Sequence, residues 1–280
     1  MKGNPIAWSA RALLALGPLL LLGACGDNSP TSGADAKPSI TVYSSRKEHL
    51  IKPLFDLYTA KTGVPIRYIT DSAGPLIARL EAEGASTPAD ILMTVDAGNL
   101  WQAAEQGLFR TLESPTLSSN IPAHLRSEGN QWFGLSIRAR TLVYATNRLS
   151  PDELSTYEDL ADPKWLGRLC LRTSKKVYNQ SLVATMISSL GEAKAESIVA
   201  GWVANLATDP FSSDTTMMEA IAAGQCDLGI ANTYYFGRMK KADPNLNLAL
   251  FWPNQQGRGV HVNISGAGVT THARQPEAAQ

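Results

Sequence analysis

The sequence has no excess of charge of either sign, and this limits the partners that it can have. Its 280 residues include 25 Lys and Arg against 25 Asp and Glu, and no basic run forms a patch. Nucleic-acid-binding domains need such a patch, so we expect no nucleic-acid partner. With 44% hydrophobic and 18% charged residues, the chain can build a core. Its length suits one large domain or two ordinary ones.

The common spacings of catalytic residues are also missing. The motifs GxSxG, HExxH, CxxC and GxxxxGK followed by Ser or Thr do not occur, and the four histidines are scattered. An enzyme on a two-lobed α/β scaffold, such as a transferase like porphobilinogen deaminase, is a rival interpretation. It needs a cofactor-bearing Cys or an acid–base set, and the sequence shows no such set. We therefore predict a binding protein that is not an enzyme.

The N-terminal apolar run is short. Residues 13–22 are too few for a stable membrane-spanning helix, and the basic residues before them are typical of an export signal. The run ends in Leu-Gly-Ala-Cys, which resembles a bacterial lipobox. Residues 1–25 are therefore predicted to be a lipoprotein signal peptide with lipid on Cys25, and an ordinary signal peptide with a stray Cys is the alternative. Residues 26–39, rich in Ser, Pro and Gly, are predicted to be a flexible tether.

Cysteine is scarce, with three residues in the whole chain. If Cys25 takes lipid, Cys170 and Cys226 remain as an even pair. In an exported protein such a pair suggests a disulfide. Closing a loop of that length is worth roughly 4 kcal/mol in the chain-entropy account. The alternative is two separate buried thiols.

Predicted strands and helices alternate along the rest of the chain. A strand at 40–45 is followed by an amphipathic helix at 48–62, and the alternation continues. This pattern predicts an α/β architecture with largely parallel sheets, and it contains too many units for one compact sheet. We therefore expect two lobes, with a hinge near 136–146 between the separate strands WFGLSIR and TLVYAT, and a return near 255–261. The expected lobes are residues 40–137, rejoined by 260–280, and residues 138–259.

Three tyrosines stand at junctions between a predicted strand and a predicted helix. In the stretch NTYYFG, Tyr234 and Tyr235 follow the strand CDLGIAN, and Tyr178 follows the strand GRLCLRTS. Ligands bind at this edge of open α/β sheets, although core packing of the rings is the alternative. Three phenolates are hard oxygen donors whose charge matches ferric iron. We therefore predict an iron site whose affinity falls as the pH decreases.

Four stretches carry a resemblance to a known family: YSSRKEHLIKPLFDLY, PADILMTVDAGNLW, RTSKKVYNQSLVA and AGQCDLGIANTYYFGR. In this order they resemble the bacterial ferric-iron-binding periplasmic proteins of ABC importers, from about Ile40 to the end. The resemblance implies a two-lobed periplasmic-binding-protein fold of type II with a hinged cleft, and iron ligands at Tyr178, Tyr234 and Tyr235. We expect a monomer, in the periplasm or at the cell surface, that hands iron to a permease in the inner membrane.

The resemblance is weaker in the first lobe. Some members place a His-Tyr pair after the Arg of YSSR, where this chain has Lys47 and Glu48. His49 is then a candidate ligand by a shift of one position, and a helix-surface residue is the alternative. Other members supply a Glu where Val95 stands, and we do not expect the following Asp96 to replace it. A synergistic anion such as carbonate is expected to complete the site, with Arg46, Arg138, Thr173 and Asn232 as its ligands.

Alternatives remain open on three points. Each of the two arginines could instead form a surface or interlobe salt bridge. A protein of the same fold could bind another solute, such as a polyamine, an oxoanion or thiamine. Family members continue past GAGVTTHARQPEAAQ with further helices, so an end at Gln280 fits a shortened chain.

Overall fold

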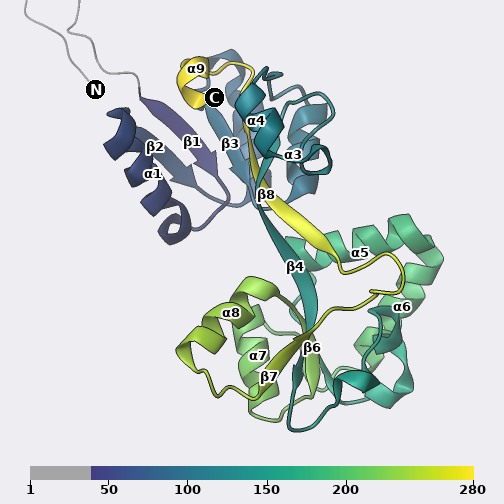
Figure 1. Ribbon diagram of the computed structural model, residues 1–280. Coiled ribbons are helices and arrows are strands. Elements are labelled where there is room, and N and C mark those ends of the chain that lie inside the picture. The colour runs from purple at the N-terminus through teal and green to yellow at the C-terminus, as the bar shows by residue number, and fades with distance from the viewer. Residues whose placement is uncertain (1–38) are drawn as a thin grey trace, which may run out of the picture. The chain divides into compact units, whose positions relative to one another are not determined.

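The computed structural model describes residues 39–280. The predicted signal peptide, Cys25 and nearly all of the predicted tether lie outside the described residues. The described part is an α/β structure (Figure 1). Across residues 39–280, no helix is long and apolar enough to cross a membrane.

The first three strands pair in parallel. β1 (Ile40–Ser44) lies between β2 (Ile66–Thr70) and β3 (Ile91–Thr94). The crossover helices are α1 (Glu48–Thr62) and α2 (Ala73–Glu83). These are the strand–helix–strand connections between parallel strands that the sequence pattern predicts.

Helix α1 forms where predicted, but most of its apolar face is not covered. Ile51 is buried, whereas Leu54 and Leu57 are 64% and 66% exposed. The helix lies beside the edge strand β2, where the rings of Phe55 and Tyr68 are tilted by 49° with centroids 5.5 Å apart. The deeper core around β1 and β3 comes from α2 and from α3 (Ala97–Glu105), which pack on these strands.

One long strand joins the two halves of the sheet. The first part of β4 (Phe133–Ala145) pairs with β8 (Val262–Val269), which also pairs with β3. Its second part pairs with β6 (Leu228–Asn232) and β7 (Leu248–Phe251). With β5 (Leu169–Cys170), the strand order is β2-β1-β3-β8-β4-β6-β5, and β7 lies off this path. Figure 1 shows β4 and β8 running between the two groups of elements.

Two details of the predicted architecture are wrong. The expected strands WFGLSIR and TLVYAT are one continuous strand, β4, with a bulge near Gly134. The sheet is also mixed rather than largely parallel, because every pairing of β4 and β8 is antiparallel. Antiparallel strands such as β4 and β8 need no crossover helix between them. The alternation of helices and strands in the sequence therefore does not reveal the direction of these two strands.

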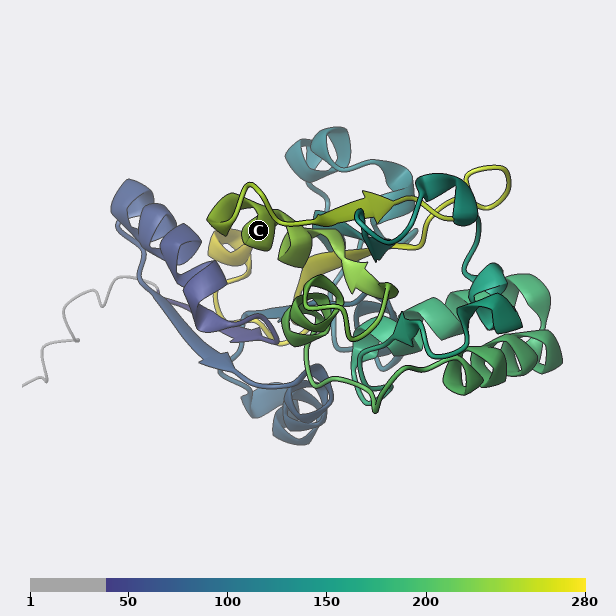
Figure 2. The same ribbon diagram turned by 90° about the horizontal axis from the view of Figure 1, so that it is seen from below.

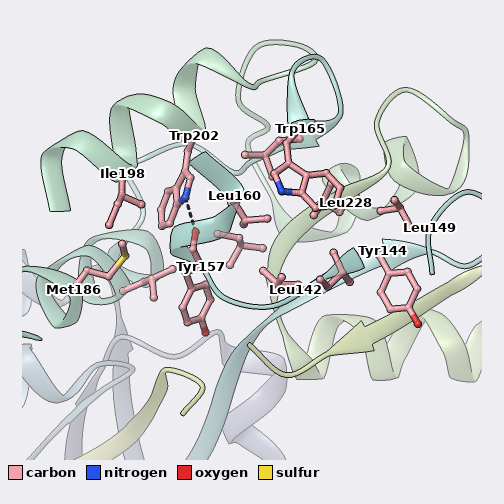
Figure 3. Packing of buried hydrophobic residues seen from close by; sticks show 14 of the residues in the cluster. Leu142, Tyr144, Leu149, Tyr157, Leu160, Trp165, Met186, Ile198, Trp202 and Leu228 are labelled. Carbon is pink, nitrogen blue, oxygen red and sulfur yellow. Dashed lines mark hydrogen bonds between the residues drawn. The ribbon is translucent and has the colours of Figure 1, made fainter. Parts of the chain in front are cut away.

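The second half of the sheet is covered on both faces. On one face α5 (Val177–Leu190) and α6 (Glu192–Ala204) lie side by side (Figure 2). In the core beneath them, the Trp202 indole donates to the Tyr157 carbonyl oxygen across 2.8 Å (Figure 3). The other face is covered by α7 (Asp214–Ala222) and α8 (Thr233–Ala242).

The predicted disulfide is confirmed. Cys170 in β5 is bonded to Cys226, shortly before β6, and both residues are buried. The bridge therefore ties together the two strands that precede the tyrosine-bearing segments. The shorter elements are α4 (Pro115–Asn120), α9 (Pro276–Ala279) and the 3-10 turns η1 (Gly84–Ser86), η2 (Ala123–Leu125), η3 (Pro151–Glu153), η4 (Glu158–Ala161) and η5 (Pro163–Trp165).

Candidate metal centre

Two helices that begin at the same edge of the sheet carry tyrosines in their first turns. β5 and β6 are parallel neighbours, so α5 and α8, which follow them, start on the same side. Tyr178 lies in the first turn of α5, and Tyr234 and Tyr235 lie in the first turn of α8. The Tyr234 hydroxyl donates to the Tyr178 hydroxyl oxygen across 3.4 Å, and the Tyr234 and Tyr235 ring centroids are 4.2 Å apart. The structure thus brings together the three phenols that the sequence places at strand-to-helix junctions.

Three guanidinium groups surround these phenols. Arg138 and Arg172 face the ring of Tyr178, with the guanidinium carbon 5.6 and 5.4 Å from the ring centroid. Arg238 faces the other two tyrosine rings at 5.9 and 5.0 Å. Positive charge at this distance favours the ionised form of a phenol.

Burial acts in the opposite direction. Tyr234 is 37% exposed as a whole residue, but desolvation of its hydroxyl by the surrounding protein is the main cause that raises its pKa, and the neighbouring Tyr178 and Tyr235 raise this pKa further. Without a bound cation, Tyr234 therefore keeps its proton at physiological pH. A cation that displaces the hydroxyl proton of Tyr234 would be bound by a negatively charged phenolate oxygen, and the nearby arginines favour this ionised form.

A buried arginine lies behind the tyrosines. Arg140 on β4 is paired in register with Asn232, and its guanidinium donates to Asn179, Asn232 and Asp214. Asn179 follows Tyr178 directly, and Asn232 immediately precedes α8. Sequence reasoning named Asn232 as an anion ligand but missed Arg140, Asn179 and Asp214. The only signal is a charged residue in the mostly apolar second part of β4, ARTLVYA.

A small hollow adjoins Tyr178. Arg138 Nη1 and Asn232 Nδ2 are buried and have no hydrogen-bond partner among the described residues. Both groups are donors whose hydrogen-bonding capacity is unused among the described residues. The residues around it are Arg138, Arg140, Tyr178, Asn232, His261 and Asn263.

The other two residues predicted to hold an anion do not line this hollow. Arg46 donates to Ser136 and Ser265 hydroxyl oxygens at 3.3 and 2.6 Å. Thr173 accepts from the Lys175 backbone N–H at 3.4 Å. Within residues 39–280, neither Arg46 nor Arg138 forms the salt bridge that was the alternative for each arginine.

Of the two first-lobe residues considered from the sequence as metal ligands, only Asp96 bonds to an element that carries a tyrosine. His49 is exposed on α1 and is not among the residues of the hollow. Asp96, in contrast, is buried at the N-terminus of α3, where Oδ1 accepts from the Gly98 backbone N–H at 2.9 Å. Its Oδ2 accepts from the Ser181 hydroxyl of α5, and from Asn263 Nδ2 of β8 at 2.6 Å. Asp96 therefore links α3, α5 and β8.

His261, which also lies beside the hollow, is neutral. Burial, and next the positive charges of Arg140 and Arg138, lower the pKa of His261 to about 4. Its ring is therefore neutral at physiological pH. Among the described residues, no three His, Cys, Asp or Glu side chains gather as a metal-binding group. The oxygen donors that do converge are the phenols.

Comparison with known proteins shows the same architecture elsewhere. The family model of the bacterial extracellular solute-binding proteins matches residues 86–280. Iron uptake protein A1 of Synechocystis sp. is 43% identical over 268 residues, which cover 92% of this chain and 74% of that protein.

Solved structures agree with this match. A Trichodesmium protein (IdiA, FutA), solved in complex with iron and citrate ligands, is 46% identical with a TM-score of 0.78, and the match covers 86% of this chain and 78% of that chain. The ferric binding protein from Campylobacter jejuni is 33% identical with a TM-score of 0.81, over 86% and 78% of the two chains.

These likenesses extend over both halves of the sheet. They confirm the predicted fold class, the two-lobed α/β fold of the type II periplasmic binding proteins, and the predicted resemblance. The matching family is named for solute binding, and the Synechocystis relative is named for iron uptake. The chain belongs to the family of bacterial extracellular solute-binding proteins.

Proposed function

We propose that this protein captures ferric iron outside the cytoplasm and delivers it to an ABC-type importer. The observation that carries the proposal is the meeting of Tyr178, Tyr234 and Tyr235 at one edge of the sheet, with two hydroxyl oxygens 3.4 Å apart. Support comes from relatives named as iron uptake and ferric-binding proteins, one of them solved with iron.

The chemistry of the phenols fits a small trivalent cation. Phenolate oxygens are hard donors, and ferric iron is a hard acceptor. Three phenolates also cancel its charge, which avoids an uncompensated charge in a closed site. Because the pKa of Tyr234 is raised, binding must release a proton there. Iron is therefore taken up at neutral pH and released by acid.

An anion is proposed to complete the coordination. The donors Arg138 Nη1 and Asn232 Nδ2 have no partner among the described residues, and they flank Tyr178 in the hollow. A small oxyanion such as carbonate would satisfy both and bond to the metal. Arg46 and Thr173 are proposed to assist it from outside the hollow.

The alternative solutes fit less well. A polyamine or thiamine carries positive charge, and Arg138, Arg172 and Arg238 beside the phenols oppose its binding. An oxoanion alone would suit the arginines but would leave three phenols without a role. Ferric iron with an anion uses both sets of groups.

The protein is proposed to act as a lipid-anchored monomer in the periplasm or at the cell surface. Residues 1–25 would be removed, Cys25 would carry lipid, and residues 26–39 would tether the binding part to the membrane. The proposed lobes are 40–137 with 260–280, and 138–259, which would close over iron and dock on the inner-membrane permease. Replacing Cys25 by Ser should move the protein from the membrane fraction to the soluble fraction. A wild-type protein that is already soluble contradicts the anchor.

Binding of the competing solutes tests the function. Metal-free protein is titrated calorimetrically with ferric citrate, phosphate, spermidine and thiamine, and protein purified without chelators is analysed for metals. We expect iron in the purified protein, tight binding from ferric citrate and a visible phenolate-to-iron absorption band. Tight binding of another solute together with no iron uptake overturns the proposal.

A further inference from the structure

One guanidinium group joins the two helix starts that carry the tyrosines. Arg140 donates through Nε and Nη2 to Asn179 Oδ1 at 3.0 and 2.6 Å. Through Nη1 it donates to Asn232 Oδ1 at 3.1 Å. Asn179 adjoins Tyr178 in α5, and Asn232 lies two residues before Tyr234. A single side chain therefore bonds to side chains close in sequence to both phenols whose oxygens meet.

The guanidinium is itself held by Asp214, the first residue of α7. Asp214 Oδ2 accepts from Arg140 Nη1 and from the Asn232 backbone N–H, each at 3.1 Å. Arg140 is 2% exposed and Asp214 0%, so water cannot readily replace these bonds. The planar guanidinium presents its donors in fixed directions, which a lysine ammonium does not. The network therefore holds the side chains of Asn179 and Asn232 in place, in addition to pairing the charges of Arg140 and Asp214.

A second contact holds Asn179 from its other end. Its Nδ2 donates to the Arg172 carbonyl oxygen at 2.6 Å, in the segment that connects β5 to α5. The side chain of Arg172 faces the ring of Tyr178. Movement of Asn179 would therefore move both the first turn of α5 and the charge beside its tyrosine.

A role in stability alone is the competing explanation. A buried ion pair is weak evidence for stability, because desolvation offsets most of the attraction. If the network served stability alone, the ion pair of Arg140 and Asp214 would be sufficient. The additional bonds to Asn179 and Asn232, close to the tyrosines, would then have no purpose. A stability role and a positioning role make different predictions, because only the second couples these bonds to the geometry of the phenols.

We propose that Arg140 is a positioning residue that sets the separation of the Tyr178 and Tyr234 phenols, acting through Asn179 and Asn232. The inference rests on the proposed capture of ferric iron, whose affinity it would tune. Metal–ligand distances tolerate errors of about 0.2 Å. A shift of one helix start by about 1 Å is therefore expected to weaken binding on the order of 100-fold.

The test compares two asparagines whose Nδ2 groups donate to backbone carbonyl oxygens, the half-buried Asn179 and the buried Asn205. Asn179→Ala removes the link from Arg140 to α5 and leaves the ion pair. Asn205→Ala is the control, because Asn205 Nδ2 also bonds two carbonyl oxygens, those of Leu160 and Asp162 at 2.9 and 2.8 Å, away from the tyrosines. Both changes should lower the melting temperature. Only Asn179→Ala should weaken ferric affinity, on the order of 100-fold, and shift the phenolate-to-iron band.

Arg140→Lys separates charge from geometry. It keeps a positive charge facing Asp214 but loses the planar guanidinium, whose donors point in fixed directions. We expect it to behave as Asn179→Ala does. The inference is overturned if both variants bind ferric iron within about twofold of wild type, or if Asn205→Ala weakens binding as much.

A measurement on metal-free protein distinguishes this inference from the proposed function. In spectra of isotope-labelled tyrosine, the ring signals of Tyr178 and Tyr234 should shift together in Asn179→Ala and stay in place in Asn205→Ala. If wild type binds no ferric iron, the proposed function fails while the ring signals still report positioning. If wild type binds iron but the ring signals of Asn179→Ala do not move, the positioning role fails.

Discussion

Reducing the Cys170–Cys226 disulfide is expected to lower the free energy of unfolding by about 4 kcal/mol. The two half-cystines are 56 residues apart in the sequence. In the chain-entropy account, the bridge acts by restricting the unfolded chain, and its effect grows with the logarithm of the loop length. Replacing both residues by Ala also removes two buried sulfur atoms, which should cost about 1 kcal/mol more.

Urea unfolding separates these two contributions. Tryptophan fluorescence reports the transition, because two of the six tryptophans, Trp165 and Trp202, are buried in the core of the second half of the sheet. Oxidised wild type, reduced wild type and the double variant Cys170→Ala/Cys226→Ala are compared. Reduction keeps the sulfur atoms, so its effect reports the loop alone. The slope of the free energy against urea should rise in both bridge-free forms, because the unfolded chain then exposes more surface.

The reasoning is refuted if reduction lowers the free energy of unfolding by less than about 1 kcal/mol, with an unchanged slope. The double variant is the matched control for the reductant. Its unfolding should not respond to a thiol, and any response would show that the reductant acts elsewhere.

Two further predictions concern the groups around the hollow. The pKa of His261 is lowered to about 4 from about 6.5, so the stability that its neutral ring contributes is present above about pH 6.5 and is lost as the pH falls towards 4. Urea unfolding of the metal-free protein should show that the free energy of unfolding falls by about 3 kcal/mol across this window. The prediction is contradicted if the His261→Gln variant has the same pH profile as wild type. Asp96→Ala should lower the free energy of unfolding by about 3 kcal/mol, because it removes a helix cap and the bonds to Ser181 and Asn263. Ser114→Ala, which removes only a cap, should lose about 1 kcal/mol, and equal losses in the two variants would show that the links from Asp96 to α5 and β8 contribute nothing.

Local patterns in the sequence were enough to predict the elements that carry the tyrosines. The apolar strand before Tyr234, the helical periodicity after it and the similar placement of Tyr178 predicted one shared edge, where the structure brings the phenols together. The even pair of Cys170 and Cys226 predicted the disulfide. Each of these inferences depends either on residues that are close in sequence or, for the disulfide, on the number of cysteines in the chain.

Long-range pairing was not predictable in this way. The continuity of β4 depends on β8, more than a hundred residues later, and no local signal in WFGLSIRARTLVYAT shows it. Arg140 is similar, because its partners come from α5, α7 and β6, and only the fold brings them together. The exposed Leu54 and Leu57 show that an amphipathic pattern predicts a helix but not what covers its face.

Titration of metal-free protein with ferric iron, followed by visible absorption, tests the central claim most directly. Wild type is compared with Tyr178→Phe, Tyr234→Phe and Tyr235→Phe, which keep the rings and remove the oxygen donors. Tyr144→Phe is the control, since Tyr144 is buried in the core of the second half of the sheet. We predict that wild type and the control bind iron tightly with a phenolate-to-iron band that acid abolishes. Each of the three variants should lose affinity steeply and lose or shift the band. If Tyr234→Phe and Tyr235→Phe bind iron as tightly as wild type, the tyrosine pair is core packing and the account is wrong.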